Sequence, residues 1–419
     1  MSLVSQYKNE TIAFAGSGGL DSMTIVKWLS EQGVRVICYT ADFGQPDESD
    51  LGAVKDRMLA AGAEAVEVID LKERLANAGL EVIKSQAYHR GRYWNTTGAA
   101  RHVLVKGMLE KMRERGIRVL SHGCTGRGND QVRFQHITNL LEPGFEIYAP
   151  WRDPTFLNQF RGRTEMIAYC ESKGLPLKAK AEVIYSTDAN MLGLTHEAGI
   201  LESITTPART VKPTMGVYPM EAPDRPESVT VHFKKGIPVG LNGKQLGPVE
   251  MILQANEIAG KQGIGLGVHL VEDRIIGIKS RGVYEAPGLE LLGTCHEFLS
   301  QLILDETAHG LYSSLSRLVA DQIYRGHWFD QASAAAGAGI DSLMVDGNGD
   351  ITVSLYKGTL SFEKAENVAA SLYSRDNASM EAIGEFNHTD SEGYLKATGQ
   401  AIKAAGINKV VNRALLQRI

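Results

Sequence analysis

The sequence predicts an α/β chain: an N-terminal domain with a parallel sheet, then an α+β domain and a C-terminal helical extension. Short apolar runs alternate with amphipathic segments through the first third, and strands joined by turns follow beyond about residue 175. The chain ends in an amphipathic segment with helical spacing. Strand–loop–helix repetition implies βαβ units and therefore parallel strands. We place the three parts at residues 1–175, 176–390 and 391–419.

Apolar runs that enter loops mark the strands of the first part, and apolar residues at helical spacing mark its helices. We expect strands at residues 11–16, 34–39, 65–69 and 118–121, and helices at 23–32, 51–61 and 71–86. Parallel sheets bind ligands at the carboxyl ends of their strands. The loops that begin at Ser17, Ala41 and Gly123 should therefore meet around one ligand.

The second part reads as strands joined by turns within residues 228–243 and 271–288, with helices at 249–262 and 292–319. Residues 341–358 are typical of a hairpin, because a DGNG turn lies between alternating segments. Residues 393–419 predict an amphipathic helix whose apolar face must be covered. Docking on the same chain and docking on another subunit are equally open.

Charge and cysteine content exclude several classes of protein. The chain has 44 basic and 49 acidic side chains, a net charge of −5, which disfavours nucleic acid as the main partner. No segment approaches the roughly 20 apolar residues of a membrane helix, and the N-terminus lacks the pattern of a signal peptide. Four widely spaced cysteines without a CxxC pair argue against a zinc site and fit a reducing compartment. We expect a cytoplasmic protein.

The strongest local motif is the run Ser17-Gly18-Gly19-Leu20-Asp21-Ser22, between a predicted strand and a predicted helix. Successive backbone N–H groups in such a turn, together with the N-terminus of the helix, bind anions. Asp21 is an anion beside an anion site, which makes sense if it helps to hold Mg²⁺. The alternative is a tight turn capped by serine and aspartate. No lysine follows the glycines, so this is not a GxxxxGK[ST] loop.

The run resembles the SGGxDS loop of the PP-loop ATP pyrophosphatases, which hold the β,γ-pyrophosphate of ATP. Residues 121–135, SHGCTGRGNDQVRFQ, resemble the signature of the argininosuccinate synthetase family. Further segments of that family resemble residues 41–50, 92–101, 149–151, 186–199 and 271–288. The local sequences of residues 186–193 and 95–97 are similar to those of its longer bacterial branch.

The resemblance implies an ATP-dependent ligase that joins citrulline to aspartate through a citrullyl-adenylate, releasing pyrophosphate and AMP, in arginine biosynthesis. It assigns residues 1–175 to a PP-loop nucleotide-binding domain, 176–390 to a synthetase domain that binds citrulline and aspartate, and 391–419 to an oligomerisation helix. It also implies Mg²⁺ brought by ATP and a homotetramer.

The resemblance transfers site roles residue by residue, and side-chain chemistry fits them: arginine suits carboxylates, glutamate suits an ammonium group, and small residues suit a tightly held nucleotide. For ATP the residues are Ala15, Gly16, Ser17, Gly18, Gly19, Leu20, Asp21, Ser22, Met23, Ala41, Gly123, Thr125, Asp130 and Asp188. For citrulline they are Tyr93, Asn129, Arg133, Ser186, Thr195, Glu197, Glu272 and Tyr284. For aspartate they are Thr97, Arg101, Thr125, Asn129 and Asp130. Asp21 and Asp130 are the catalytic candidates.

Each residue taken alone has a structural alternative. Arg101 could be a surface ion pair, Tyr93 and Tyr284 could be core rings, and Ser186 could cap a helix. The general base is also open, because substrate or phosphate oxygens could replace Asp130. His122 and Cys124 are assigned to packing or loop geometry.

The chain departs from the family pattern at a few positions. Gly16 stands where an aromatic residue is usual, Gly98 where animal enzymes have serine, and Arg127 where lysine is usual. The competing functions are another PP-loop adenylating enzyme, such as a transfer-RNA thiolase or a glutamine-dependent synthetase, and an inactive nucleotide-binding paralogue. A transfer-RNA thiolase would call for a basic surface or paired cysteines, and a glutamine-dependent synthetase would need an amidotransferase nucleophile. Neither feature is found in the sequence.

Overall fold

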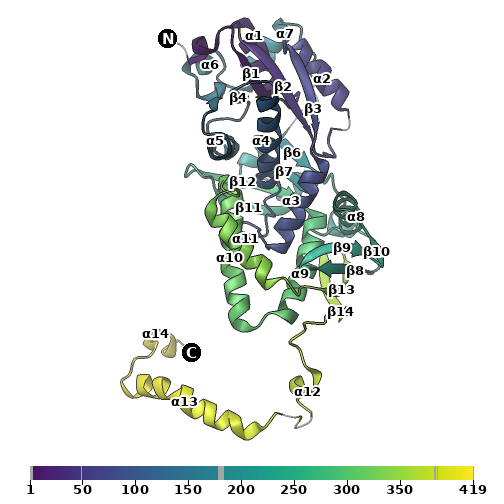
Figure 1. Cartoon of the computed structure of the whole chain (residues 1–419), viewed down its shortest axis with the longest axis vertical. Coiled ribbons are helices and arrows are strands. Elements are labelled where there is room, and N and C mark those ends of the chain that lie inside the picture. The colour runs from purple at the N-terminus through teal and green to yellow at the C-terminus, as the bar shows by residue number, and fades with distance from the viewer. Residues whose placement is uncertain (1–2, 49, 178–183, 382–383, 385, 419) are drawn as a thin grey trace. The chain divides into compact units, whose positions relative to one another are not determined.

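The computed structural model describes residues 3–48, 50–177, 184–381, 384 and 386–418. The chain forms two compact units, residues 1–370 and residues 371–419 (Figure 1). The first unit contains a parallel sheet and two antiparallel sheets, and every residue that lines the main cavity belongs to it. Within the described residues, no helix is both long and apolar enough to cross a membrane.

The N-terminal sheet is parallel throughout, as predicted. Its strand order is β3-β2-β1-β4-β5. The strands are β1 (Thr11–Ala15), β2 (Arg35–Asp42), β3 (Ala65–Asp70), β4 (Val119–His122) and β5 (Glu146–Tyr148). The sequence did not indicate β5, because three residues are too few for an apolar pattern. All five carboxyl ends lie along one edge, so the loops that follow β1, β2 and β4 share that edge.

Helices cover both faces of this sheet, because successive side chains of a strand point to opposite faces. Ile12 and Phe14 pack with side chains of α1 (Leu20–Glu31), α2 (Leu51–Ala60) and α7 (Arg163–Ser172). Ala13, between them in β1, belongs to the cluster that includes α3 (Lys72–Lys84), α4 (Thr96–Glu114) and α5 (Asp130–Leu141). The predicted α/β arrangement with a parallel sheet is confirmed.

Residues 92–101, which resemble a segment of the family, include the start of helix α4. The helix begins at Thr96, after Asn95 in a left-handed conformation with φ 53°. Thr97 and Arg101 therefore lie one helical turn apart on a buried helix. Gly98 faces α10 (Glu306–Arg325), where a Cβ would lie 3.1 Å from the carbonyl oxygen of Ile323. The serine of animal enzymes would need that neighbouring helix to shift.

Two antiparallel sheets follow, as the turn-rich pattern predicted. One has the order β11-β12-β7-β6 and the other β10-β9-β8-β13-β14. Their strands are β6 (Ser186–Asn190), β7 (Gly193–Glu197), β8 (Glu227–Lys234), β9 (Ile237–Leu241), β10 (Lys244–Gln245), β11 (Val268–Asp273), β12 (Lys279–Glu285), β13 (Gly349–Tyr356) and β14 (Thr359–Glu366). The helix expected at residues 249–262 is α8 (Pro248–Lys261).

Three expectations about this part were wrong. The single helix at 292–319 is two helices, α9 (Pro287–Ile303) and α10, because Asp305 caps α10 by accepting from the Ala308 N–H. Residues 341–358 are not a hairpin, since 341–343 end α11 (Gln331–Leu343) and the hairpin joins β13 to β14. The alternative of Ser186 as a helix cap fails as well, because that residue begins strand β6.

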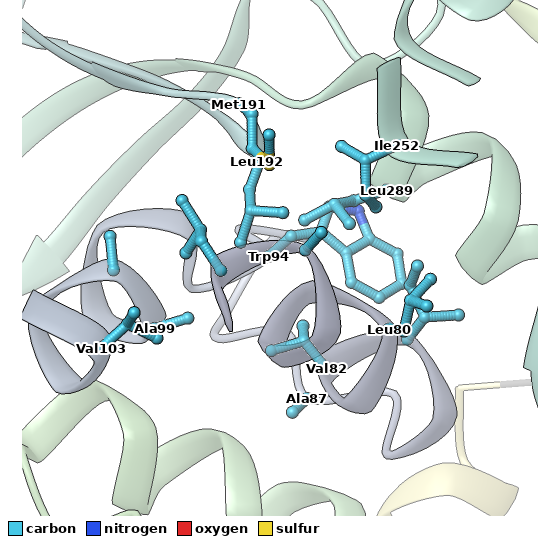
Figure 2. Packing of buried hydrophobic residues seen from close by; sticks show 14 of the residues in the cluster. Leu80, Val82, Ala87, Trp94, Ala99, Val103, Met191, Leu192, Ile252 and Leu289 are labelled. Carbon is cyan, nitrogen blue, oxygen red and sulfur yellow. The ribbon is translucent and has the colours of Figure 1, made fainter. Parts of the chain in front are cut away.

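The largest apolar cluster joins the N-terminal helices to the antiparallel part of the first unit. Figure 2 shows Trp94 within it, surrounded by residues of α3, α8 and α9 such as Leu80, Ile252 and Leu289. Trp94 lies so close to Gly293 of α9 that an added Cβ would sit 2.1 Å from the indole ring. This packing holds the two parts of the first unit rigidly together around the cavity described below.

Short helices complete both units. In the first they are η1 (Leu3–Tyr7), η2 (Pro150–Arg152), α6 (Pro154–Gln159), η3 (Gly199–Glu202), η4 (Ala208–Thr210) and η5 (Pro219–Glu221). The second unit contains α12 (Arg375–Ala378), α13 (His388–Ile407) and α14 (Arg413–Leu416). The terminal helix expected at 393–419 thus begins earlier and ends at Ile407. None of the residues of α13 is buried, and Leu395 and Ile402, seven positions apart on one face, are exposed.

Candidate functional site

A cavity of about 620 Å³ lies at the carboxyl edge of the parallel sheet. Its walls come from the loops after β1, β2 and β4, from α4 and α5, and from β6, β7, β11 and β12. This volume lies in the range of small-molecule sites, which measure roughly 300–1,000 Å³. The loops that the sequence placed at one edge therefore do meet around one space.

Most of the residues selected from the sequence line this cavity. They are Ala15, Gly16, Ser17, Gly19, Asp21, Ser22, Ala41, Tyr93, Thr97, Arg101, Gly123, Thr125, Asn129, Asp130, Arg133, Asp188, Thr195, Glu197, Glu272 and Tyr284. The structure does not bring Gly18, Leu20, Met23 and Ser186 into the lining. Met23 is buried in the apolar core beside β1, and Ser186 is exposed at the start of β6.

The loop after β1 has the geometry of an anion site. Gly18 has φ +68°, a conformation that favours glycine, and a Cβ there would lie 2.9 Å from Val54. Ser22 Oγ accepts from the Ser17 N–H at 3.2 Å and lies 3.1 Å from Ser17 Oγ. Helix α1 has Gly19 as its N-cap, and no side chain makes a capping hydrogen bond at that position. The positive N-terminal end of α1 faces this loop and suits an anion.

Helix α2 supports this loop from behind. Arg57 donates from Nε to the carbonyl oxygen of Gly18 at 3.0 Å and from Nη2 to Glu48 at 2.9 Å. At Gly16 an added Cβ would lie 3.2 Å from the end of the Met58 side chain. Met58 therefore occupies the space beside the position where the family usually has an aromatic ring.

Asp21 lies in the first turn of α1 and lines the cavity. Burial raises the pKa of its carboxyl group above the usual value. No cluster of three or more potential metal-ligating side chains is found among the described residues. A carboxylate beside a bound anion is stabilised when a cation lies between the two charges, so the position of Asp21 would suit a cation held mainly by the anion.

The end of β2 and the segment after it form the side of the cavity next to the loop of residues 17–22. Gln45 accepts from the Phe43 N–H at 2.8 Å and donates to the carbonyl oxygen of Ala41 at 3.0 Å. Thr40, within β2, donates to the carbonyl oxygen of Gly16 at 2.8 Å and so joins this strand to the loop after β1. The resemblance covered residues 41–50 and assigned a site role only to Ala41, because the contacts of Thr40 and Gln45 become apparent only in the folded chain.

Four charged side chains form an alternating row along the cavity. Arg101 donates to Asp130 at 2.9 Å and to Asp188 at 2.7 Å, and Arg133 donates to Asp130 at 2.7 Å. Burial opposes ionisation of Asp130, but Arg101 and Arg133 outweigh it and lower the pKa of that carboxyl. For Asp188 burial dominates and raises the pKa, although Arg101 opposes the rise. The alternative of Arg101 as a surface ion pair is wrong, and Asp130 is a weak proton acceptor in this arrangement.

The remaining wall combines aromatic rings, hydroxyls and two carboxylates, of which Glu272 is buried. Tyr93 and Tyr284 have ring centroids 4.4 Å apart, and Tyr284 donates its hydroxyl to Glu272 at 2.9 Å. Thr97 and Thr195 share a hydrogen bond of 3.1 Å. Burial raises the pKa of Glu197, which the nearby Arg274 partly opposes. Carboxylates and hydroxyls at this end of the cavity suit a ligand that carries an ammonium group.

His122 and Cys124 line the cavity without the properties of catalytic groups. His122 accepts from the Cys124 N–H at 3.2 Å and stacks on Phe134. Burial lowers the pKa of His122 to about 3 and raises that of the Cys124 thiol. Both side chains are therefore neutral near pH 7, in agreement with the role in packing expected for them.

Two family models match the chain over nearly its whole length. The first, described as Arginosuccinate synthase N-terminal HUP domain, matches residues 11–176, and the second, Arginosuccinate synthase C-terminal domain, matches residues 185–405. The chain belongs to the argininosuccinate synthase family. The two matched regions both contribute walls to the one cavity, since Asp21 and Arg101 lie in the first and Asp188 and Glu272 in the second.

Individual relatives agree with this assignment. The argininosuccinate synthase of Rhodopirellula baltica is 38% identical over 399 residues, which are 95% of this chain and 98% of the relative. That of Thermotoga maritima is 37% identical and covers 94% of this chain and 97% of its own. The chloroplastic argininosuccinate synthase of Arabidopsis thaliana is 34% identical over 97% of this chain and 81% of its own.

The cavity of this family member also has lining residues that the sequence did not single out. Besides Thr40, Phe43 and Gln45, they include Arg274 and Tyr324. Arg274 donates to the carbonyl oxygen of Arg127 at 3.1 Å and lies 3.6 Å from Glu197. Tyr324 comes from the last turn of α10, beyond the position where the sequence pattern predicted the helix to end.

Proposed function

We propose that this chain joins citrulline to aspartate at the expense of ATP and forms argininosuccinate, AMP and pyrophosphate. The observation that supports this most directly is one cavity that combines three kinds of site. An anion-binding loop lies after β1, and a row of arginines and carboxylates lies beside α4. The third site combines Glu272 of β11, which is buried, and Glu197 of β7 with Tyr284 of β12 and Tyr93. Those sites suit a triphosphate, a dicarboxylate and an amino acid with an ammonium group, respectively.

The ligands are assigned as the sequence resemblance indicated. The loop of residues 17–22 takes the two terminal phosphates of ATP, and the segment around Ala41 lies on the adenine side. Citrulline takes the wall with Arg133, Glu272 and Tyr284, and aspartate takes the region of Thr97 and Arg101. Arg101 already has two carboxylate partners, which supports its selection for a carboxylate ligand.

The reaction has two steps. The ureido oxygen of citrulline attacks the α-phosphorus of ATP, and pyrophosphate leaves into the loop of residues 17–22, where N–H groups stabilise its charge. The amine of aspartate then attacks the central carbon of the citrullyl-adenylate, and AMP leaves. Positioning alone contributes roughly 7–11 kcal/mol to such a reaction, so no covalent enzyme intermediate is required.

Two groups complete this scheme. Mg²⁺ brought by ATP would be held by phosphate oxygens and Asp21, and it would neutralise charge on the pyrophosphate. The proton acceptor for the aspartate ammonium is assigned to substrate or phosphate oxygens, because the two arginine partners of Asp130 keep it ionised and weakly basic.

Product analysis tests the proposal. Pyrophosphate should appear from ATP when citrulline is present, and AMP should accumulate when aspartate is added. Dependence on both amino acids also separates this reaction from other PP-loop adenylations and from nucleotide binding without turnover. Formation of ADP and orthophosphate would contradict the proposal.

We further propose that the protein is a cytoplasmic homotetramer in which α13 docks on another copy of the chain. The helix is 20 residues long, and its own unit does not bury any of its side chains. Exposed Tyr394, Leu395 and Ile402 supply an apolar surface that a partner would cover. The four cysteines are free, which fits a reducing compartment.

A further inference from the structure

Tyr324 is a buried tyrosine whose hydroxyl lies between two side chains of the cavity. The residue is 3% exposed. Its hydroxyl accepts from Asn129 Nδ2 at 2.8 Å and donates to Glu272 Oε2 at 2.5 Å. A second acceptor, the carbonyl oxygen of Asp273, is 3.3 Å away, so the single proton is best placed toward Glu272.

The same residue also orients Arg133. Arg133 donates from Nε to the carbonyl oxygen of Tyr324 at 2.9 Å, and its guanidinium lies 5.2 Å from the centre of the tyrosine ring. Asn129 and Arg133 lie at the start of α5 and Glu272 lies on β11, and all three were assigned to citrulline. Tyr324 therefore contacts three members of one proposed ligand wall from a position behind them.

The position of Tyr324 does not depend on a ligand. Its ring stacks on His89, with centroids 3.9 Å apart and planes 10° from parallel. Helix α10 is held against α4, because Asn95 donates to the carbonyl oxygen of Ala320 and Gly98 packs on Ile323. A hydroxyl fixed in this way can impose one orientation on the side chains that it contacts.

Glu272 needs such support. Its side chain is buried, and its two oxygens accept from the hydroxyls of Tyr284 and Tyr324, one each. A buried carboxylate is costly unless hydrogen-bond donors surround it. Loss of one donor would let the carboxylate rotate or recruit water, and its alignment with a ligand would suffer.

We propose that Tyr324 is a positioning residue for citrulline, acting through Glu272 and Asn129. This inference rests on the proposed function. A positioning role in ground-state binding predicts a change in KM for citrulline with kcat largely preserved. A role in folding alone predicts a change in stability and equal, small effects on all three substrates.

The variant Y324F tests the inference, because it removes the hydroxyl and keeps the ring and the main-chain acceptor. Citrulline-dependent pyrophosphate release should show a KM for citrulline raised about 10- to 100-fold, the cost of losing a hydrogen bond to a charged group. The KM for ATP should stay within about threefold, since the ATP contacts lie elsewhere. In an E272Q background, Y324F should add less than about threefold, because the hydroxyl acts through that carboxylate.

Tyr312 provides a matched control on the same helix. It is also 3% exposed, and its hydroxyl donates to the carbonyl oxygen of Lys84 at 2.7 Å, away from the residues that line the cavity. Y312F should lower the melting temperature as much as Y324F and leave the KM for citrulline unchanged. Equal citrulline KM values for the two variants would overturn the inference while leaving the function intact. Absence of citrulline-dependent release from the unaltered chain would instead remove the proposed function, and the inference with it.

Discussion

Arg101 of α4 donates from Nη2 to Asp188 Oδ2 of β6 at 2.7 Å. This contact joins a helix of the nucleotide-binding part to a strand of the antiparallel part, across 87 positions of the chain. The same guanidinium donates to Asp130. A dicarboxylate that binds here must share Arg101 with Asp130 and Asp188 or displace them. Its affinity therefore depends on how well it competes with these two carboxylates for the guanidinium.

Replacement of Arg101 by lysine should raise the KM for aspartate. Lysine keeps the charge and loses the planar fork that serves two acceptors. Loss of one charged hydrogen bond corresponds to about 1.5–3 kcal/mol, or roughly 10- to 150-fold in KM. AMP release is measured with aspartate varied and citrulline saturating. The control R113K lies further along the same helix, where an exposed arginine pairs with Glu142, and it should behave like the unaltered chain. An unchanged KM for aspartate in R101K would contradict the assignment.

Replacement of Asp21 by asparagine should stop pyrophosphate release. Asparagine keeps the size of the side chain and removes the charge that fits a cation beside the phosphates. We expect a loss of about 100-fold or more in kcat, comparable to removal of a group that stabilises the transition state. Pyrophosphate is measured with ATP and citrulline. The control E31Q changes a carboxylate at the other end of α1, where it pairs with Lys173, and should retain activity. Near-normal release by D21N would remove Asp21 from the mechanism.

The pKa of Asp130 predicts how stability depends on pH. Its folded-state pKa is lowered by Arg101 and Arg133 against the opposing effect of burial. Ionised Asp130 therefore stabilises the fold above the ordinary carboxyl pKa, and this contribution is lost as pH falls through the lowered value. D130N should reduce the free energy of unfolding by about 2–4 kcal/mol at neutral pH, as for a broken buried pair. The difference should persist at pH 5 and shrink once the pH falls below the ordinary pKa of an aspartate carboxyl. Denaturant titration at these pH values measures it, and a difference that grew toward acid would contradict the sign.

We expect that the fold requires glycine at position 293, because a larger residue would clash with a packed side chain. A Cβ there would lie 2.1 Å from the Trp94 ring, which is itself 1% exposed and cannot withdraw. G293A should lower the free energy of unfolding by about 2 kcal/mol, after allowing about 1 kcal/mol for the better helix propensity of alanine. G310A in the exposed part of α10, where a Cβ would meet nothing within 4 Å, should stabilise the protein by about 0.5–1 kcal/mol. Denaturant titration of both variants compares them, and equal effects would contradict the packing argument.

The exposed apolar face of α13 predicts a change of assembly. I402E places a charge on that face and should reduce the mass of the proposed tetramer, because burial of an unpaired charge is costly. K403Q changes the neighbouring position of the same helix and should leave the mass unchanged. Light scattering of both variants, and of a chain that lacks residues 394–419, gives the result. An unchanged mass for I402E and for the shortened chain would count against docking through this helix.

Local chemistry alone determined several features of the protein. The parallel sheet followed from apolar runs such as residues 11–16, and the anion loop followed from its glycines and hydroxyls, because these patterns act through the backbone within a few residues. The site residues carried over by family resemblance also came together, with few exceptions, in the cavity.

Tertiary structure alone decided which side chains act on one another. The bond between Asn129 and Tyr324 spans 195 positions, and the ion pair of Arg101 with Asp188 spans 87. No local pattern encodes such a contact, because it exists only after α4, α10 and the antiparallel sheet have packed. The end of α9 was missed for a related reason: residues 292–319 keep their helical apolar pattern, and a single capping bond from Asp305 interrupts the helix. The sequence thus determined the kinds of group at the site, and packing determined their partners and their protonation.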